Sequence, residues 1–384
     1  MKILKIQSLL FTIFLGISSI LTYALADTSL IDVNYQFDQT KLEASVDSFH
    51  FLRSFVDYYY KLIPSNAQSL NLGHKASRFS GWCAGDAHPE NFGTLLQDNS
   101  TVIFGMNDMD DSGPCLVAYD FLRLLVSSRL YWPQLKLEKT IDFYLRGLDL
   151  ENVAIPSYIQ SLVKSGQIAG SAVNPKDIQG NLLKRKKNTI EVTSADRLII
   201  ENSLKELFLT TDFISENIKV IDVLSKLKEG GGSGGLLRYE ILCSLGSGEK
   251  LHLELKELTV PGISSIAFGP IPNQKSRMHK SLLIEQGDKT SHYYTVLLIN
   301  GKSMLLRPKF FGNIGITLSE NLITTTNNSD VINYEAYLLG RIHAQTVDVS
   351  QYRKALTELK AYEWENDVNA FTKHFNQKFI QQKN

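Results

Sequence analysis

The sequence has no excess of either charge, because its 384 residues contain 40 Lys and Arg side chains against 40 Asp and Glu side chains. A balanced chain has no general electrostatic attraction to nucleic acid or to an anionic membrane, so we expect no nucleic-acid partner. No internal repeat is visible, and after residue 26 no apolar run is long enough to span a bilayer. Ligands must therefore be recognised by local clusters of residues.

Cysteine is scarce, with Cys83, Cys115 and Cys243 as the three in the chain. Their spacing fits no zinc-binding pattern. One disulfide with a free thiol and three buried thiols are both compatible with three cysteines in an oxidising compartment. Because cysteine packs well as a small apolar side chain, we expect three buried thiols.

The first 26 residues differ from the rest of the chain. Their only charges are two lysines near the start, an apolar stretch covers residues 9–21, and Ala24-Leu25-Ala26 has the small residues of a cleavage site. These features predict a secretory signal peptide at 1–26, with an uncleaved membrane anchor as the alternative. We expect a periplasmic or secreted protein that contacts a membrane only through this segment, if the segment is retained.

Hydrophobic periodicity divides the remaining chain into helical and strand-rich parts. Helical spacing of apolar residues predicts helices at 41–63, 117–131, 194–208, 212–228 and 274–286, two more within 138–165, and a helical end from 330 onward. Alternation and apolar runs predict strands at 79–84, 101–107, 236–245, 251–258, 291–300 and 303–310. We therefore expect an α+β fold with a helical part at 27–215, a β-rich part at 216–312 and C-terminal helices at 313–384.

The most informative residues lie in the sequences GDAHPENFG at 85–93 and NDMDD at 107–111. Pro89 stops the first sequence from continuing as a helix, so a loop can hold Asp86 and Asn91 towards one point. Asp108 follows a buried strand, and oxygens of Asp and Asn are ligands that Mg²⁺ takes together with substrate phosphates. In phosphoryl transfer the first Asp handles the acceptor hydroxyl, and the Asn and second Asp hold metal. The alternative is a capped turn in which Asp86 and Asn91 satisfy backbone amides.

A glycine-rich segment and a lysine form a second motif. The sequence GGGSGG at 230–235 would let backbone amides approach phosphates, and Lys256 would reach the same phosphates from a following strand. Glu285, on the helix predicted at 274–286, is the expected partner that orients Lys256. The alternatives are a flexible linker for the glycines and an exposed strand position for the lysine. The residues expected to bind the nucleotide are Gly230, Gly232, Ser233, Gly235, Lys256 and Glu285.

These motifs resemble known families. DAHPEN is similar to the catalytic loops of protein kinases and aminoglycoside phosphotransferases. The stretches GDAHPENFGT, FGMNDMDDSGPCLVAYDFLRLLVSS, GGGSGGLLR, LHLELKE and YLLGRIHAQ resemble, in this order, the bacterial family known as domain of unknown function 2252. The resemblance runs from about residue 41 to residue 345 and so covers nearly the whole mature chain.

That family looks like a kinase-fold relative, which implies a two-lobed protein-kinase-like fold. In kinases the glycine loop and lysine come before the catalytic loop, whereas here they follow it by about 140 residues. The resemblance therefore implies a circular permutation, with the helical catalytic lobe first, the β-rich glycine-loop lobe second and helices returning at the C-terminus. Permutation is tolerated where the original chain ends lie close together.

The resemblance also implies roles for individual residues, and the implied cofactors are Mg²⁺ and ATP. By position in the motifs, the catalytic residues are Asp86 and His88, the metal-binding residues are Asn91, Asp108 and Asp110, and the residue that supports the catalytic loop is Asp120. His88 replaces the loop residue that touches the transferred phosphoryl group. Two departures occur, since Cys83-Ala84-Gly85 precedes the catalytic Asp and Met109-Asp110 replaces Phe-Gly.

Three functions are compatible with these motifs. The first is an exported phosphotransferase or nucleotidyl transferase that uses Mg-ATP on a small-molecule or protein acceptor. The second is an exported binding protein without turnover, which the signal peptide favours because ATP is scarce outside the cytosol. The third is a binuclear metallophosphoesterase, for which GDxH is a familiar fragment, but the sequence lacks the Gly-Asn-His block of such enzymes. We expect the first.

Overall fold

The computed structural model describes residues 29–384 except 99, 211–212, 229 and 318–326. The expected signal peptide at 1–26 lies outside the described residues. None of the helices in the described ranges is long and apolar enough to cross a bilayer. The helices are α2 (Gln39–Ala44), α3 (Ser48–Ser54), α4 (Val56–Asn66), α5 (Asn71–Lys75), α6 (Val117–Tyr131), α7 (Leu137–Leu148), α8 (Ser157–Ala169), α9 (Ser194–Phe208), α10 (Gln274–Gln286), α11 (Asn327–Ala344), α12 (Val349–Thr357) and α13 (Ala361–Lys383). The strands are β1 (Ser80–Cys83), β2 (Phe92–Leu96), β3 (Val102–Met106), β4 (Gly113–Leu116), β5 (Ile178–Gln179), β6 (Leu182–Leu183), β7 (Thr189–Glu191), β8 (Lys219–Lys226), β9 (Arg238–Ser244), β10 (Lys250–Glu257), β11 (Thr295–Ile299) and β12 (Lys302–Pro308).

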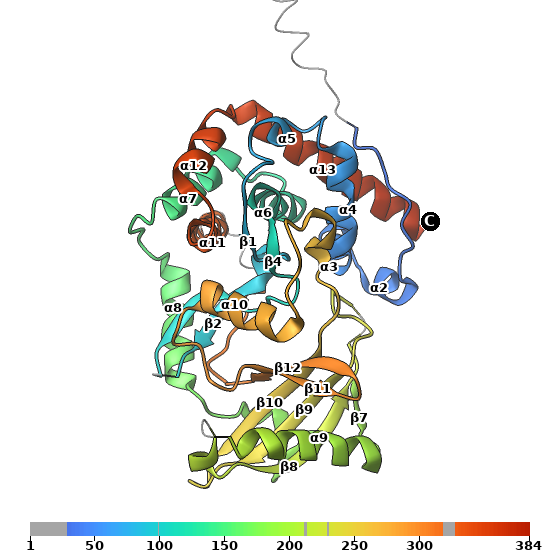
Figure 1. Cartoon of the computed structure of the whole chain (residues 1–384), viewed down its shortest axis with the longest axis vertical. Coiled ribbons are helices and arrows are strands. Elements are labelled where there is room, and N and C mark those ends of the chain that lie inside the picture. The colour runs from blue at the N-terminus through green and yellow to red at the C-terminus, as the bar shows by residue number, and fades with distance from the viewer. Residues whose placement is uncertain (1–28, 99, 211–212, 229, 318–326) are drawn as a thin grey trace, which may run out of the picture.

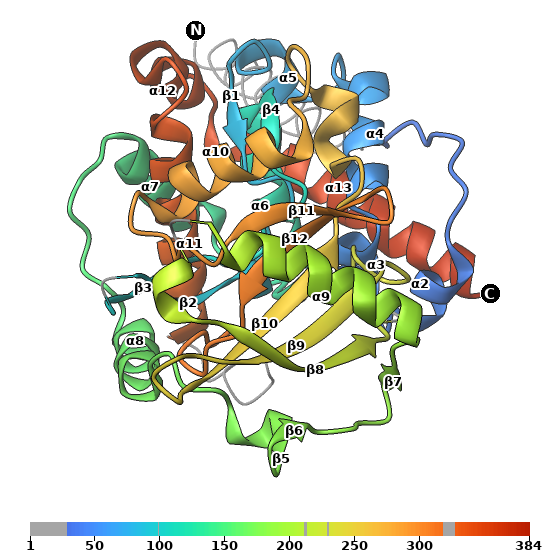
Figure 2. The ribbon, with the colours of Figure 1, turned by 60° about the horizontal axis from the view of Figure 1, so that its bottom comes forward.

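A six-stranded antiparallel sheet, with the order β11-β12-β10-β9-β8-β7, forms one end of the molecule (Figure 1). Because side chains alternate along a strand, the three leucines of β10 share one face and are buried there. They belong to the same apolar core as Ile200, Leu204 and Phe208 of α9. Helix α9 therefore covers this face of the sheet (Figure 2).

Most of the helices gather at the other end of the molecule around α6 (Figure 1). Helix α6 is apolar nearly all round, and its residues from Val117 to Ser128 are buried. It packs against α3, α11, α13 and β1, and its side chains join the largest apolar core. Two short antiparallel ribbons, β1–β4 and β2–β3, extend from this group of helices. The loop at 84–91 follows β1 and the segment at 107–112 joins β3 to β4, so the ends of these ribbons position both acid motifs.

The sequence predicts much of this secondary structure correctly. The mixed helix and strand content confirms an α+β class. Helices α6, α9 and α10 have the predicted bounds, and the hairpins β9–β10 and β11–β12 form where the alternating sequences lie. The predicted division of the chain differs in one respect. Strand β7 pairs with β8, and α9 packs on the sheet, although both belong to the range assigned to the helical part.

Two helix predictions are wrong. The range 41–63 forms three short helices, because the Asp47 side chain caps the start of α3 and Phe55 has a non-helical φ of −124° and ψ of 63°. Val46, expected on the apolar face, is 72% exposed. The described residues of 212–228 contain strand β8 instead of a helix. A run rich in Ile and Val favours a strand when a neighbouring strand, here β9, is free to pair with it.

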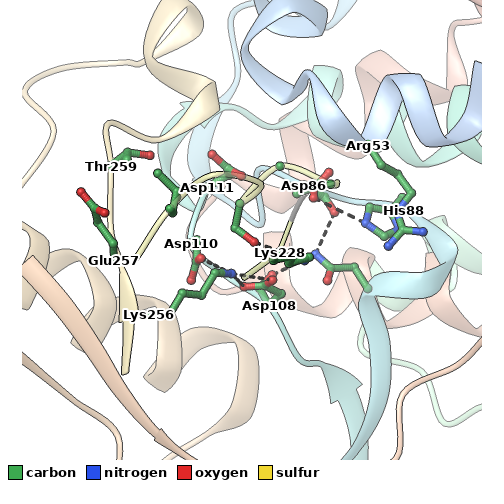
Figure 3. Close-up of a pocket in the computed structure, with 15 residues that line it drawn as sticks. Arg53, Asp86, His88, Asp108, Asp110, Asp111, Lys228, Lys256, Glu257 and Thr259 are labelled. Carbon is green, nitrogen blue, oxygen red and sulfur yellow. Dashed lines mark hydrogen bonds and ion pairs between the residues drawn. The ribbon is translucent and has the colours of Figure 1, made fainter. Parts of the chain in front are cut away.

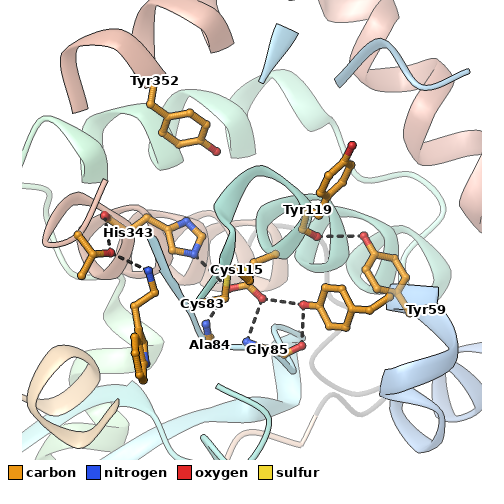
Figure 4. The surroundings of a disulfide bond; sticks show 12 residues. Tyr59, Cys83, Ala84, Gly85, Cys115, Tyr119, His343 and Tyr352 are labelled. Carbon is orange, nitrogen blue, oxygen red and sulfur yellow. Dashed lines mark hydrogen bonds and ion pairs between the residues drawn. A yellow bond between two sulfur atoms is a disulfide. The ribbon is translucent and has the colours of Figure 1, made fainter. Parts of the chain in front are cut away.

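The cysteine prediction is also wrong. Cys83 and Cys115 form a disulfide between β1 and β4, and Cys243 is a buried free thiol in β9 (Figure 4). The register opposes Cys83 to Gly113 and Gly81 to Cys115, so the two cysteines are diagonal neighbours. Their Cα atoms lie 5.8 Å apart, within the range that a disulfide requires. The bond ties together the two strands next to the acid motifs.

Candidate active site

A buried carboxylate supports the loop at the end of β1. Asp120, in the first turn of α6, accepts hydrogen bonds from the backbone amides of Ala84 at 2.8 Å and Gly85 at 3.0 Å. The Tyr60 hydroxyl donates to the same carboxylate at 2.9 Å, and Nε2 of His343 lies 3.1 Å from it (Figure 4). These hydrogen bonds replace the contacts with water that the carboxyl group of Asp120 loses on burial. The position that the sequence assigns to a supporting acid therefore lies beneath the loop.

Gly85 brings this loop into contact with the segment at 107–112. Its φ is +85°, in the left-handed region that favours glycine. A Cβ at this position would lie 2.0 Å from the carbonyl oxygen of Asp111. Only glycine therefore fits between the two acid segments.

Replacement of Gly85 by alanine should destabilise the protein by more than the ~1–2 kcal/mol that positive φ costs an L-residue. The added methyl group must also push Asp111 away. Gly248→Ala is the matched control, because Gly248 has a φ of +88° and no atom within 4 Å of the added Cβ. Urea unfolding of both variants measures the difference, and equal losses of unfolding free energy would contradict the expected clash.

Asp86 takes part in a buried ion pair with a residue of α6. Nη2 of Arg123 donates to Oδ1 of Asp86 at 2.6 Å and to the carbonyl oxygen of Leu52 at 3.1 Å. Nε2 of His88 lies 3.4 Å from the other carboxyl oxygen. Burial acts to raise the pKa of Asp86, but His88 and Arg123 outweigh it and hold the pKa below its usual value. Asp86 is thus an ionised carboxylate with a fixed direction.

Lys256 connects the sheet to the other acid segment. Its Nζ donates to Oδ1 and Oδ2 of Asp108 at 2.9 and 2.8 Å and contacts a carboxyl oxygen of Asp110 (Figure 3). The lysine is 1% exposed and lies on the face of β10 opposite the leucines. The alternative of an exposed strand lysine is therefore wrong. Residues separated by 148 positions in the chain meet here in one cleft.

The pKa values of the two acids that contact Lys256 are shifted in opposite directions. Burial acts to raise the pKa of Asp108, but Lys256 and Arg307 hold it well below its usual value. Burial and the neighbouring Asp108 charge raise the pKa of Asp110, against the opposing effect of Lys256. Asp108 is therefore ionised and able to bind a cation, and a bound cation would oppose the upward shift of the Asp110 pKa by offsetting the charge of Asp108.

Asp111 is a cleft residue that the sequence reasoning did not assign. Its Oδ1 accepts a hydrogen bond from the backbone amide of Gly262 at 2.6 Å. Burial and the charge of Asp86 raise the pKa of Asp111 to about 7, although the Gly262 amide opposes the shift. The sequence signal was its place as the last acid of NDMDD, which does not show whether the side chain faces the cleft.

Asn91 joins the two acid segments through its side-chain nitrogen. Nδ2 donates to the backbone carbonyl oxygens of Asp86 and Asp108, each at 3.0 Å. The amide oxygen is the atom that remains for a cation. Asp108, Asp110 and Asn91 thus offer oxygen donors, the ligand type that Mg²⁺ prefers. Oδ1 of Asp110 is buried without a hydrogen-bond partner among the described residues, which fits a cation site.

A second group of residues, of types that can bind metals, is not available as a metal site. Cys83, Asp120 and His343 lie close together in the core. Cys83 is oxidised in the disulfide, and Asp120 already accepts backbone hydrogen bonds. We therefore assign no metal to this group.

The glycine-rich segment is an ordered turn between β8 and β9, so a flexible linker does not describe it. Gly231 and Gly235 have φ values of +76° and +77°, and the Gly235 amide donates to the Lys228 carbonyl oxygen at 2.9 Å. Gly232 and Ser233 line the cleft. Gly230, predicted as a cleft residue, packs against α2 instead, where an added Cβ would lie 3.0 Å from Cβ of Ala44.

The structure does not bring Glu285 to Lys256, so this prediction needs correction. Glu285 is buried on α10, and neither carboxyl oxygen has a hydrogen-bond partner among the described residues. Burial and the charges of Asp120 and Asp108 raise its pKa well above the usual value. Instead, Asp108 and Asp110 contact Nζ of Lys256 and orient the lysine.

Two adjoining cavities form the cleft, and they share Arg53, Asn91 and Asp108. The smaller has a volume of about 70 Å³ and is walled by both acid segments, Lys256 and the glycine-rich turn (Figure 3). The larger has a volume of about 360 Å³, and its walls include Tyr294, which precedes β11, and residues of β12 and the segment after it, such as Arg307 and Phe310. Both cavities have charged walls, and the larger one also has aromatic side chains.

Comparison with known proteins gives one match. Residues 41–141 match the model of a bacterial family described as "Uncharacterized protein conserved in bacteria (DUF2252)". The matched range contains the loop at 84–91, the segment at 107–112 and α6, and it ends before the glycine-rich turn. It supports the resemblance to this family. No curated protein and no solved structure matches the chain.

Proposed function

We propose that the protein is an exported, kinase-like transferase that uses Mg-ATP to modify a small-molecule or protein acceptor. One observation carries the proposal: Lys256 contacts Asp108 and Asp110 in a cleft that Asp86, Asn91 and the glycine-rich turn also line. Phosphoryl-transfer enzymes use such a set, because positioning and neutralisation of phosphate charge supply most of the catalysis.

Each residue would have a distinct task. Asp108, Asp110 and Asn91 would hold Mg²⁺, which neutralises phosphate charge when bound. Lys256 would exchange its contact with the acids for one with the phosphates. Asp86, held ionised by Arg123, would accept a hydrogen bond from the acceptor hydroxyl and direct it. His88, next to Asp86, would lie at the transferred group.

The order of elements supports a permuted kinase-like arrangement. The glycine-rich turn joins β8 to β9, Lys256 lies on the next strand, and α10 follows before the hairpin β11–β12. In protein kinases the glycine loop, a strand lysine and a helix follow one another in the same way. The acid loop and its supporting Asp120 come earlier in this chain. The departure is the helix carboxylate, since Glu285 makes no contact with the lysine.

The cavities favour phosphoryl over nucleotidyl transfer. The larger cavity has room for a nucleobase beside Tyr294 and Phe310, whereas the smaller one is lined by Asp86 and the other residues of both acid segments. A nucleotide with its base in the larger cavity would direct its terminal phosphate towards Asp86. Release of ADP supports this orientation, and release of pyrophosphate would indicate nucleotidyl transfer.

The proposal is tested by calorimetric titration of the mature protein with ATP, with and without Mg²⁺. Asp108→Asn should weaken Mg-dependent ATP binding by at least about tenfold, because it removes a charged metal ligand. Asp98→Asn is the matched control, since Asp98 accepts hydrogen bonds from the His292 amide outside the cleft. Absence of nucleotide binding in the unmodified protein, or equal binding by Asp108→Asn, would contradict the proposal.

A second candidate is a nucleotide-binding protein without turnover. The ion pair between Arg123 and Asp86 favours it, because a carboxylate held by a buried guanidinium is a weak base. Mg-ATP binding with no consumption of ATP, over a range of hydroxyl acceptors, would support this function over transfer.

A further inference from the structure

Two cationic side chains donate hydrogen bonds to one hydroxyl group of the glycine-rich turn. Nζ of Lys228 donates to Oγ of Ser233 at 3.2 Å, and Nη2 of Arg238 donates to the same oxygen at 3.0 Å. A serine hydroxyl has two acceptor lone pairs and one hydrogen. Because both lone pairs are engaged, the hydroxyl hydrogen remains to be donated to an acceptor in the cleft. Ser233 is 8% exposed, so this geometry is held by the protein.

Lys228 is the cation of this group that forms no ion pair with a described residue. Arg238 forms an ion pair with Glu254, and Lys256 contacts Asp108 and Asp110. Among the residues that the structure describes, Lys228 forms no ion pair, although it lines the same small cavity. Withdrawal from water, followed by the charges of Lys256 and Arg238, lowers the pKa of Lys228 to about 8, although the charge of Asp108 opposes the shift. An anion at this point would relieve the repulsion between the cations.

We propose that Lys228, Ser233 and Arg238 form a subsite for the terminal phosphate of a nucleoside triphosphate, and that Lys228 makes the protein prefer a triphosphate to a diphosphate. The inference rests on the proposed function and adds a specificity residue to the same cleft. A phosphate oxygen would accept the hydrogen of the Ser233 hydroxyl and a charge-assisted hydrogen bond from Lys228. A diphosphate, whose phosphates are held by Lys256 and the metal, would leave the subsite without an anion.

The test compares the affinities of Mg-ATP and Mg-ADP in the full mature protein by calorimetry. We expect Lys228→Met to weaken ATP binding by about 10- to 100-fold, the effect of one lost charge-assisted hydrogen bond, and to change ADP binding less than about threefold. Ser233→Ala should reduce the same preference. Lys226→Met is the matched control, because Lys226 lies two positions away and pairs with Glu240 at 2.8 Å; it should alter neither affinity.

The outcomes separate the two proposals. If the unmodified protein binds neither nucleotide, the proposed function fails together with this subsite. If the unmodified protein binds ATP with Mg²⁺, but Lys228→Met weakens the binding of ATP and ADP equally or weakens the binding of neither, the proposed function stands and the subsite is overturned. Inorganic triphosphate is a probe without a base, and its binding should also weaken in Lys228→Met. Unchanged triphosphate binding in that variant would count against the subsite.

Discussion

Lys256→Met is expected to lower the free energy of unfolding by about 3–5 kcal/mol at pH 7, because it leaves two carboxylates together in a cleft without their cation. Asp108, whose pKa is now low, stabilises the fold above its unfolded pKa. Without the lysine, Asp108 and Asp110 repel each other and their pKa values rise. Such a pair destabilises the fold as pH rises above about 4. The loss of unfolding free energy in Lys256→Met should therefore be larger at pH 8 than at pH 5.

The same variant should respond to a divalent cation by itself. Lys256 Nζ contacts the oxygens that would bind Mg²⁺, so the metal and the lysine compete for them. Mg²⁺ without nucleotide should raise the melting temperature of Lys256→Met more than that of the unmodified protein. Lys250→Met is the control from the same strand, since Lys250 contacts Gly180 and Asn181 away from the cleft. An equal Mg²⁺ response in all three proteins would refute the competition.

Removal of the disulfide by Cys83→Ser with Cys115→Ser is expected to cost about 3–4 kcal/mol, the value for a loop closed over 32 residues. The bond joins β1 to β4, a ribbon of four residues in each strand, and two-stranded ribbons are marginal without support. The loop at 84–91 begins and the segment at 107–112 ends at the same end of this ribbon. The Mg-ATP binding that we propose should therefore be lost in the variant before the helical core unfolds.

Urea unfolding with and without reductant checks the disulfide prediction. The unmodified protein, denatured and reduced before refolding, should have the lower stability of the double variant. Cys243→Ala is the control, because Cys243 is a free buried thiol in β9, and it should remain sensitive to reductant. A double variant as stable as the oxidised protein would show that strand pairing alone holds the ribbon.

The elements that sequence predicts best are those whose pattern is local. Helix α6 has apolar residues on nearly all its sides, and β10 shows its alternation in the letters LHLELK. The predicted helix at 212–228 failed because the strand depends on pairing with β9, which no local pattern contains. The disulfide was missed for the same reason, since it depends on the register between β1 and β4.

The candidate site was predictable where residue type alone limits the chemistry. Asp86, Asn91, Asp108 and Lys256 line one cleft, as the motifs indicate. Arg123 and Lys228 were not assigned, because an arginine within an apolar helix and a lysine before glycines have many other uses. Their importance comes from geometry, which brings Arg123 to a carboxylate and gives Lys228 no ion pair among the residues that the structure describes. The prediction for Glu285 failed because the position of a residue on a helix does not reveal which acidic side chain contacts the lysine.

The long separation between the parts of this cleft bears on how the protein is made. Asp120 meets His343 across 223 positions, and Asp108 meets Lys256 across 148. Contacts so distant in sequence form late in folding, because chain closure must precede them. A nascent chain that has not yet reached residue 256 holds acids without their cation. Synthesis must therefore pass residue 256 before the acids have their cation and residue 343 before Asp120 has all its partners, so shorter translation products would lack the complete cleft.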